Sequence, residues 1–175
     1  MASQNRGQRG VTLIEACIVT TIAGAVVGVT VPGLQSLFDA RRIGGAATQF
    51  ATDVQFARSE AVARNRPVRL SFHAPACYVI HTGNAAQCEC DAAGPALCSA
   101  GAEQIKTVHL PAAERVSLQA NVASVLFDPL HGTSTPTGTV RVIGPDGREV
   151  HHVINIMGRV RSCSPLAAVA GYRAC

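Results

Sequence analysis

The sequence predicts an α+β fold in which one long N-terminal helix, membrane-spanning in its first half and amphipathic in its second, packs on an antiparallel β-sheet domain. Three observations lead to this prediction. An apolar run of 21 residues extends from Val11 to Val31, long enough for a helix to cross a hydrocarbon core. Apolar residues at helical spacing follow it. Beyond residue 67 the pattern changes to the alternation typical of β-strands.

A short basic leader, residues 1–10, precedes the apolar run and ends in Arg9-Gly10. A secretory signal has its small-residue cleavage site after the apolar stretch, whereas Gly10 lies before it. Cleavage between Gly10 and Val11 would leave the apolar helix on the mature protein and create an α-ammonium group at Val11. The basic residues of the leader predict a cytoplasmic N-terminus, so the remainder of the chain is expected on the other side of the membrane.

Glu15 is the one acidic or basic side chain within the apolar run. A carboxylate inside the hydrocarbon region costs about 2.5–3.5 kcal/mol on insertion scales, so it needs a partner. We expect that partner to be the α-ammonium group of Val11 on a neighbouring copy. Glu15 would then set the axial register between packed helices.

The helix is expected to continue beyond the membrane span 11–31 as an amphipathic domain spine over residues 32–66, where Arg66-Pro67 ends it. Pro32 and Gly44-Gly45 are the expected bends. One face of this spine is apolar: Leu34, Leu37, Phe38, Ala47, Phe50, Val54, Ala57, Ala61 and Val62. Charged residues fall largely on the other face: Arg41, Arg42, Asp53, Arg58, Glu60 and Arg64.

Residues 67–175 are expected to form the β domain. A strand pair is predicted at Val68–His73 and Cys77–His81, and a hairpin from Thr139–Ile143 and Glu149–Ile156 around Gly144-Pro145-Asp146-Gly147. Shorter strands are expected at 104–110, 115–119 and 125–127, with turns over 128–138. The segment 82–101, rich in Ala, Gly and Cys, is expected to be a loop ordered by disulfides. Residues 158–175 form a C-terminal tail.

Six cysteines lie in the β domain and a seventh, Cys17, lies in the apolar run, where it acts as a small hydrophobic residue. An even number in an exported domain favours disulfides. A bridge between Cys163 and Cys175 would staple the tail, leaving two bridges among Cys77, Cys88, Cys90 and Cys98. A zinc site made by those four is the alternative, although Cys88 and Cys90 lack the Cys-x-x-Cys spacing of a zinc ribbon.

The sequence gives little support for catalysis. The six histidines show no metal-ligand spacing, and His151 and His152 would point to opposite faces of a strand. Neither a nucleophile elbow nor a phosphate-cradling glycine motif is present. The formal charge of +4 falls to +2 once Arg6 and Arg9 leave with the leader, so the total charge does not indicate nucleic-acid binding. We therefore expect no enzymatic activity, no metal and no cofactor.

Several motifs resemble those of a known family. Arg9-Gly10-Val11-Thr12-Leu13-Ile14-Glu15, followed by Pro32, resembles the type III signal of type IV pilins and pseudopilins, although that family usually has Phe where this chain has Val11. Three further segments resemble the GspH/FimT family of minor pilins. They are Ala57–Val68 at the end of the spine helix, Phe127–Gly132 in the middle of the domain, and Gly158-Arg159-Val160-Arg161 near the C-terminus.

The resemblance implies a minor pilin of a type IV pilus, FimT-like, at the tip or in assembly priming. It implies cleavage after Gly10, methylation of the new N-terminus, and assembly through Glu15. The implied partners are other major and minor pilins, the prepilin peptidase and the inner-membrane assembly platform. The protein would begin as a single-pass inner-membrane protein with a periplasmic domain and end in a cell-surface pilus. The alternative is a GspH-type minor pseudopilin of a type II secretion system.

Arg159 and Arg161 are the candidate binding residues. Alternation places both on one face of an extended segment, about 6.5–7 Å apart, near the phosphate spacing of one nucleic-acid strand. Arg173 would join them if a Cys163–Cys175 bridge folds the tail back. Arginine binds phosphate without reading sequence, and the resemblance to competence-associated pilins implies DNA capture for uptake by this pair. The alternative is a solvated arginine pair that protects a sheet edge.

Overall fold

The computed structural model describes residues 12–90, 94–110 and 112–175. The chain divides into two compact units, Met1–Phe38 and Asp39–Cys175. Helix α1, Leu13–Arg64, belongs to both and runs without interruption through Pro32 and Gly44-Gly45. Gly10 and Val11, the predicted processing site, lie outside the described residues.

The start of α1 is defined by Thr12, whose Oγ1 accepts a hydrogen bond from the backbone N–H of Glu15 at 3.3 Å, as in an N-cap. In the first unit the described residues 12–28 are all exposed, including the large apolar side chains of Leu13 and Ile18, at 83% and 54%. No helix in the described part of the chain combines the length and mean hydropathy that a membrane span requires. The span over 11–31 stays a prediction.

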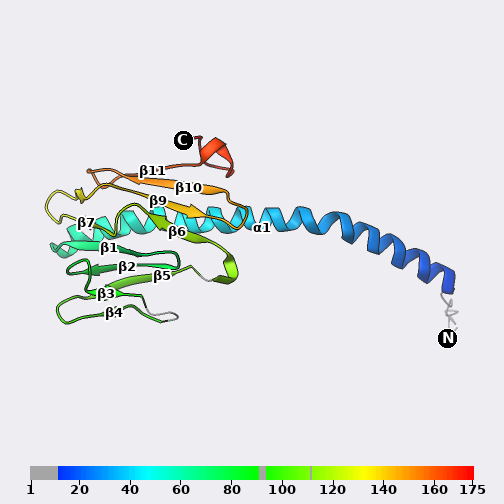
Figure 1. Ribbon diagram of the computed structural model, residues 1–175, viewed down its shortest axis with the longest axis horizontal. Helices are drawn as coiled ribbons and strands as arrows, with labels where there is room; N and C mark the ends of the chain where they lie inside the picture. The colour runs from blue at the N-terminus through cyan, green and yellow to red at the C-terminus, as the bar shows by residue number, and fades with distance from the viewer. Residues whose placement is uncertain (1–11, 91–93, 111) are drawn as a thin grey trace, which may run out of the picture. The chain divides into compact units, whose positions relative to one another are not determined.

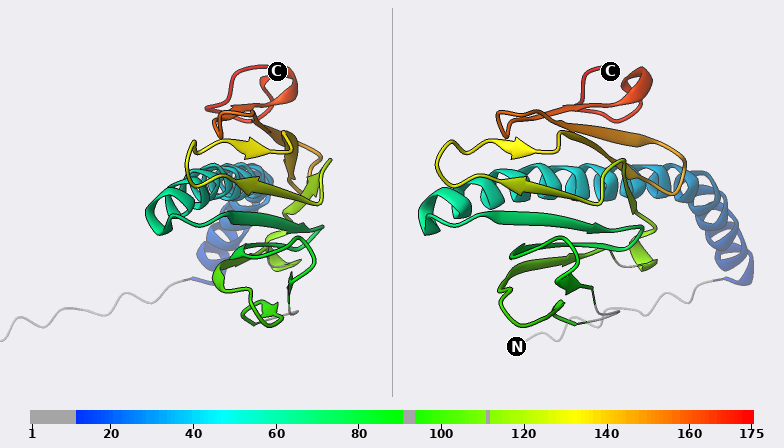
Figure 2. Two further views of the ribbon diagram at one scale, coloured as in Figure 1. Left: turned by 90° about the vertical axis from the view of Figure 1, so that its left-hand side faces the viewer. Right: turned by 60° about the vertical axis from the view of Figure 1, so that its left-hand side comes forward.

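In the second unit two antiparallel sheets face the helix (Figures 1 and 2). The five-stranded sheet has the order β5 (Gln104–His109), β2 (Cys77–Thr82), β1 (Val68–His73), β7 (Ser124–Phe127) and β8 (Ser134–Thr135). The four-stranded sheet has the order β11 (Val160–Cys163), β10 (Glu149–Ile154), β9 (Gly138–Ile143) and β6 (Ser117–Ala120). A separate pair joins β3 (Cys88–Glu89) to β4 (Leu97–Cys98), and two 3-10 turns, η1 and η2, cover Ala112–Glu114 and Pro165–Ala167.

The two sheets share one hydrophobic core against α1. Phe50, Val54, Ala57 and Ala61 from the helix contact inward-facing residues of both sheets: Val68, Leu70, Tyr78, Ile80, Leu118, Val125, Phe127, Val140 and Ile154. A second cluster, near the start of this unit, joins the helix to the four-stranded sheet and the tail through Ile43, Ala47, Val116, Val142, Val150 and Val169. The prediction of a helix packed on antiparallel strands is therefore confirmed, with two sheets in place of one.

The strand positions differ from the prediction mainly in short elements. The pair β1–β2 and the hairpin β9–β10 are confirmed, with register Val68↔Thr82 in the first and Glu149↔Ile143 in the second. The predicted loop 82–101 contains the short pair β3–β4, and the predicted turn region 128–138 contains β8. The helix ends at Arg64, two residues before its predicted end.

The prediction of Asp53 on the polar helix face is wrong. Asp53 is 1% exposed, and its carboxylate accepts hydrogen bonds from the Tyr78 hydroxyl at 2.7 Å and from the Lys106 ammonium at 2.6 Å. Gln49 donates a further bond at 3.0 Å. Burial, and then the contact with Asp53, raises the pKa of Tyr78, so this hydroxyl stays protonated as a donor. The buried carboxylate ties α1 to the edge strand β5.

The six cysteines of the β domain form three disulfides: Cys77–Cys90, Cys88–Cys98 and Cys163–Cys175. The predicted tail bridge is confirmed, and the zinc alternative is wrong because all four of its candidate thiols are consumed in disulfides. Two of the bridges organise the segment between β2 and β5, where Cys88 and Ala96 pack on Val79 at the outer face of the five-stranded sheet. Cys17 is a free, exposed thiol.

Candidate nucleic-acid interface

The candidate arginines follow a tight turn that joins β10 to β11. The backbone N–H of Gly158 donates to the carbonyl of Asn155 at 2.9 Å, and the N–H of Asn155 donates to the carbonyl of Arg159 at 3.1 Å. The Asn155 side chain closes the turn by accepting a bond from the N–H of Arg159 at 3.0 Å. Gly158 has φ = 68°, a left-handed conformation that favours glycine. The turn therefore fixes where β11 begins.

Alternation along β11 separates the arginines from the core. Val160 packs against the main core cluster, whereas Arg159 and Arg161, on either side of it, are exposed. Arg161 lies opposite Val153 of β10, which is 41% exposed on the outer face of the four-stranded sheet. Arg161 therefore lies on the outer face of a strand at the edge of that sheet, and Arg159 immediately precedes this strand. That the two side chains share one face stays a prediction.

The C-terminal tail returns to the end of the same strand. Ser164 donates its backbone N–H to the carbonyl of Arg173 at 2.8 Å and forms a parallel bridge with Ala174. The Cys163–Cys175 disulfide closes this loop, and Val169 anchors it in the second core cluster. Arg173, itself exposed, therefore lies beside Ser164, the residue that follows β11. That it joins Arg159 and Arg161 in one site stays a prediction.

These three arginines have no acidic neighbour, unlike several others in the domain, although exposed Arg41 and Arg66 also form no ion pair among the described residues. Arg64 pairs with Glu60 and Glu103, Arg42 pairs with Asp39, and Arg148 contacts Asp146. Across residues 12–90, 94–110 and 112–175, no ion pair involves Arg159, Arg161 or Arg173. Exposed guanidinium groups without a protein counter-ion are available to an external anion such as phosphate.

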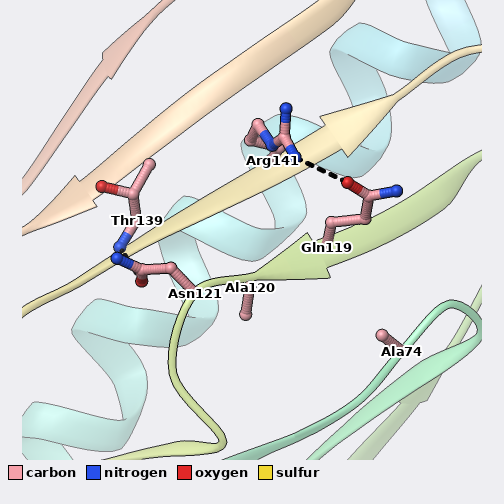
Figure 3. A pocket seen from close by; sticks show the side chains of 6 residues that line it. All are labelled: Ala74, Gln119, Ala120, Asn121, Thr139 and Arg141. Atoms are coloured by element: carbon pink, nitrogen blue, oxygen red, sulfur yellow. Dashed lines mark hydrogen bonds between the residues drawn. The ribbon is translucent and has the colours of Figure 1, made fainter.

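A second basic position lies in a hollow of about 530 Å³ between β6, β9 and the turn at Ala74. Figure 3 shows Arg141 in this hollow, bonded to Gln119 at 2.7 Å. The Glu149 carboxylate lies 3.8 Å from the same guanidinium group. Because Arg141 is already compensated within the domain, this hollow is a weaker candidate for an anion than β11.

The structure also brings together a serine and a histidine that the sequence did not connect. Ser71 Oγ lies 2.8 Å from His81 Nε2, and His81 Nδ1 lies 2.9 Å from the carbonyl of Thr82. Burial lowers the pKa of His81, which keeps the ring neutral. Ser71 and His81 are 2% and 0% exposed, so the described contact is sealed from solvent and joins β1 to β2.

Three segments that carry the family resemblance meet at one place in the fold. Arg58, near the end of α1, donates from Nε to the carbonyl of Gly132 at 2.8 Å. Gln55 of the same helix lies with Nε2 3.4 Å from the carbonyl of Gly158. The spine helix, the 127–132 turn and the Gly158-Arg159-Val160-Arg161 motif are therefore in direct contact, a convergence that the sequence did not indicate.

The long helix, the two antiparallel sheets and the helix-facing core define a pilin-like protein. Two crystal structures of the type IV minor pilin FimU of Pseudomonas aeruginosa, strain PAO1, are similar to this chain at 18% sequence identity. One covers 71% of this chain and 93% of its own with a TM-score of 0.54, and the other covers 70% and 96% with a TM-score of 0.51. At this level of identity the likeness shows the fold.

The family model described as type II transport protein GspH matches residues 46–158. The match spans more than half of the chain, so the protein belongs to the GspH family, as the motifs predicted. It begins within the spine helix and ends at Gly158, immediately before the two arginines. Comparison with curated proteins gave no match.

Proposed function

We propose that the protein is a minor pilin of a type IV pilus, acting at the tip or in assembly priming, and that it binds DNA through Arg159, Arg161 and Arg173. Membership of the GspH family and the minor-pilin fold support the assembly role. The exposed arginine strand supports the binding role. In this proposal the N-terminal helix anchors the chain in the inner membrane before it enters a filament.

The proposed assembly surface is the first part of α1. Its described apolar side chains are exposed, Ile14 at 69% and Ile22 at 59% among them. A helix with so much apolar surface needs a membrane or other helices around it. In a filament, the helices of other pilins would surround it. The leader makes the prepilin peptidase a proposed partner, and membership of the family makes the inner-membrane assembly platform another. Glu15 and Val11 of adjacent subunits would set the register.

One observation carries the binding role: Arg159 and Arg161, at the start of an edge strand, are both exposed and have no acidic partner in the described chain. Their spacing suits successive phosphates. Nothing in this arrangement reads base edges, so the proposal is for weak binding without sequence preference. DNA captured in this way at a pilus would serve uptake in natural transformation.

The test uses the full chain in detergent micelles and a fluorescent duplex of mixed sequence. With about three phosphate contacts, log K should fall with log salt concentration at a slope near −2.7. Replacing Arg159 and Arg161 together by Gln should abolish binding with almost no change in thermal stability, because both side chains are exposed. Arg41→Gln with Arg42→Gln is the matched control and should bind normally. Wild-type protein that shows no salt-dependent binding at low ionic strength would contradict the proposal.

A second candidate function is supported by the family description, which names a type II transport protein. In that case the chain is a minor pseudopilin and its partner is an exported protein. Deletion of the gene separates the two functions: loss of surface pili and of DNA uptake supports the first, whereas loss of protein secretion with normal pili supports the second.

A further inference from the structure

We infer that Arg58 is a positioning residue for the arginine strand: it locks the turn that precedes Arg159 to the spine helix. The consequence for DNA affinity rests on the function proposed above. The lock itself is a statement about the fold and can be measured separately.

The contact is short and partly shielded from solvent. Arg58 is half-buried, and its Nε donates to the Gly132 carbonyl at 2.8 Å. Gly132 is held by its own turn, where its N–H donates to the carbonyl of Asp128 at 2.9 Å. The Asp128 carboxylate accepts further bonds from the backbone N–H groups of Leu130 and His131, at 3.0 and 2.8 Å. The acceptor of Arg58 is therefore a fixed carbonyl.

Gly158 is pressed against both partners of this hydrogen bond. A Cβ atom built on Gly158 would lie 2.7 Å from the Gly132 carbonyl oxygen and 3.0 Å from Cδ of Arg58. A Cβ atom on Gly132 would lie 2.9 Å from Nε of Arg58. Both glycines have positive φ, 61° for Gly132 and 68° for Gly158. A side chain at Gly158 would therefore collide with the backbone of Gly132, and one at Gly132 would displace the Arg58 guanidinium group. The three residues form one close-packed unit, which we call the turn lock.

A serine fastens the other side of the turn. Ser134 of β8 donates its N–H to the Ile156 carbonyl at 2.8 Å and its hydroxyl to the Asn155 carbonyl at 2.6 Å. Asn155 in turn binds the backbone of Arg159. The turn is thus fixed to β8 by Ser134 and to α1 by Arg58. Arg159, the next residue after Gly158, takes its position from both.

Arginine suits this role because its planar guanidinium group offers several fixed N–H directions on a stem that packs against neighbours. Lysine would keep the charge and lose the Nε–H donor next to the stem. Charge and position can therefore be separated by substitution.

The experiment compares Arg58→Lys and Arg58→Gln with wild type, as full chains in detergent micelles, using the same mixed-sequence duplex. We expect both variants to bind about tenfold more weakly, the equivalent of one lost charge-assisted contact. Hydrogen exchange measured by mass spectrometry should increase in peptides that cover 128–134 and 155–161. Arg64→Gln, on the same helix and outside the turn lock, is the control and should change neither readout.

Two glycine variants provide an independent measurement, which decides the matter if both Arg58 variants unfold. Gly158→Ala should raise exchange across 155–161 and weaken binding about tenfold or more. Gly147→Ala should leave both unchanged: Gly147 has a similar φ of 78°, and nothing lies within 4 Å of its added Cβ.

Normal affinity in Arg58→Lys together with weak binding in Arg58→Gln would overturn the inference, because Arg58 would then act by charge. Unchanged exchange in all the Arg58 and Gly158 variants would also overturn it. If wild-type protein fails to bind DNA while exchange rises as expected, the turn lock stands and the proposed binding function fails.

Discussion

At the scale of single residues, protonation of His152 should make the stability of the protein depend on pH. His152 is a fully buried residue of β10 in the four-stranded sheet. Its Nδ1 lies 2.8 Å from the Ser162 hydroxyl, and its ring lies 5.1 Å from that of Phe50 on α1, centre to centre. Its Nε2 has no hydrogen-bond partner among the described residues. Burial, assisted by neighbouring His151, lowers the pKa of His152 from 6.5 to about 4.

This shift predicts acid sensitivity. Between its folded pKa of about 4 and its unfolded pKa of 6.5, the unfolded chain binds more protons than the folded one. The free energy of unfolding should therefore fall as the pH falls through that window. From about pH 7 to about pH 4.5 the loss attributable to His152 should be about 2 kcal/mol, measured by urea unfolding at each pH.

The variant His152→Leu tests the assignment. It should be less stable than wild type at neutral pH, because the bond to Ser162 is lost, yet its stability should fall less on acidification. Burial also lowers the pKa of His81, so a smaller acid dependence should remain. An acid dependence in His152→Leu as steep as in wild type would contradict the role of this ring.

Asp53 shows that helical spacing can indicate the burial of a residue but cannot identify its distant partners. The sequence placed it with the charged face of the helix, yet it lies three residues after Phe50 and four before Ala57, both of which are buried. That spacing places Asp53 on the core-facing side of the helix, so its burial could have been predicted from the sequence. Its partners Tyr78 and Lys106 come from strands 25 and 53 residues away, and no local pattern identifies them.

At the scale of elements, the three disulfides predict how many thiols per chain remain reactive. Protein made in an oxidising compartment and then denatured without reductant should react with one equivalent of thiol reagent per chain, at Cys17. The three bridges should each contribute about 2–4 kcal/mol to stability. Seven reactive thiols, or stoichiometric zinc, would contradict the pairing.

The predictable elements were those with enough residues to show a period. Val68–His73 alternates apolar and polar residues, so the strand could be predicted from the sequence, although Ser71 is also buried. Glu149–Ile154 alternates in burial but not in residue type, because His152 is buried and Val153 is exposed, so its inward face could not be read from the sequence. Strands β3, β4 and β8 have two residues each, too few for any periodic signal. They form because a disulfide or a neighbouring strand holds them. The division into two sheets depends on β6 pairing with β9 and not with β5, which is a choice of tertiary packing.

In the candidate site, too, the local features could be predicted from the sequence and the long-range contact could not. Alternation around Val160 predicted that Arg159 and Arg161 point away from the core, and both are exposed. The tail bridge predicted the return of the chain, which places Arg173 beside Ser164. The contact between Arg58, Gly132 and Gly158 brings Arg58 to Gly132, 74 residues further along the chain, and to Gly158 beyond it. A single sequence holds no information on which carbonyl a distant arginine will find.

At the scale of the whole molecule, assembly should depend on Glu15. Glu15→Val should be processed and inserted into the membrane, because the substitution makes the helix more apolar. It should nevertheless fail to enter filaments, since no carboxylate would neutralise the Val11 ammonium group of the neighbouring subunit. Immunoblots of sheared filaments and of membranes, compared with wild type, measure this. Normal incorporation of Glu15→Val would contradict the register role.

The central claim, that this chain is a processed pilin, is tested most directly by the mass of the protein recovered from wild-type cells. We predict a mature N-terminus at Val11, with leader residues 1–10 removed, and retention of the leader in a Gly10→Val variant, because a larger side chain at the cleavage site should block the peptidase. Wild-type protein that still carries the intact leader from Met1 would contradict the account.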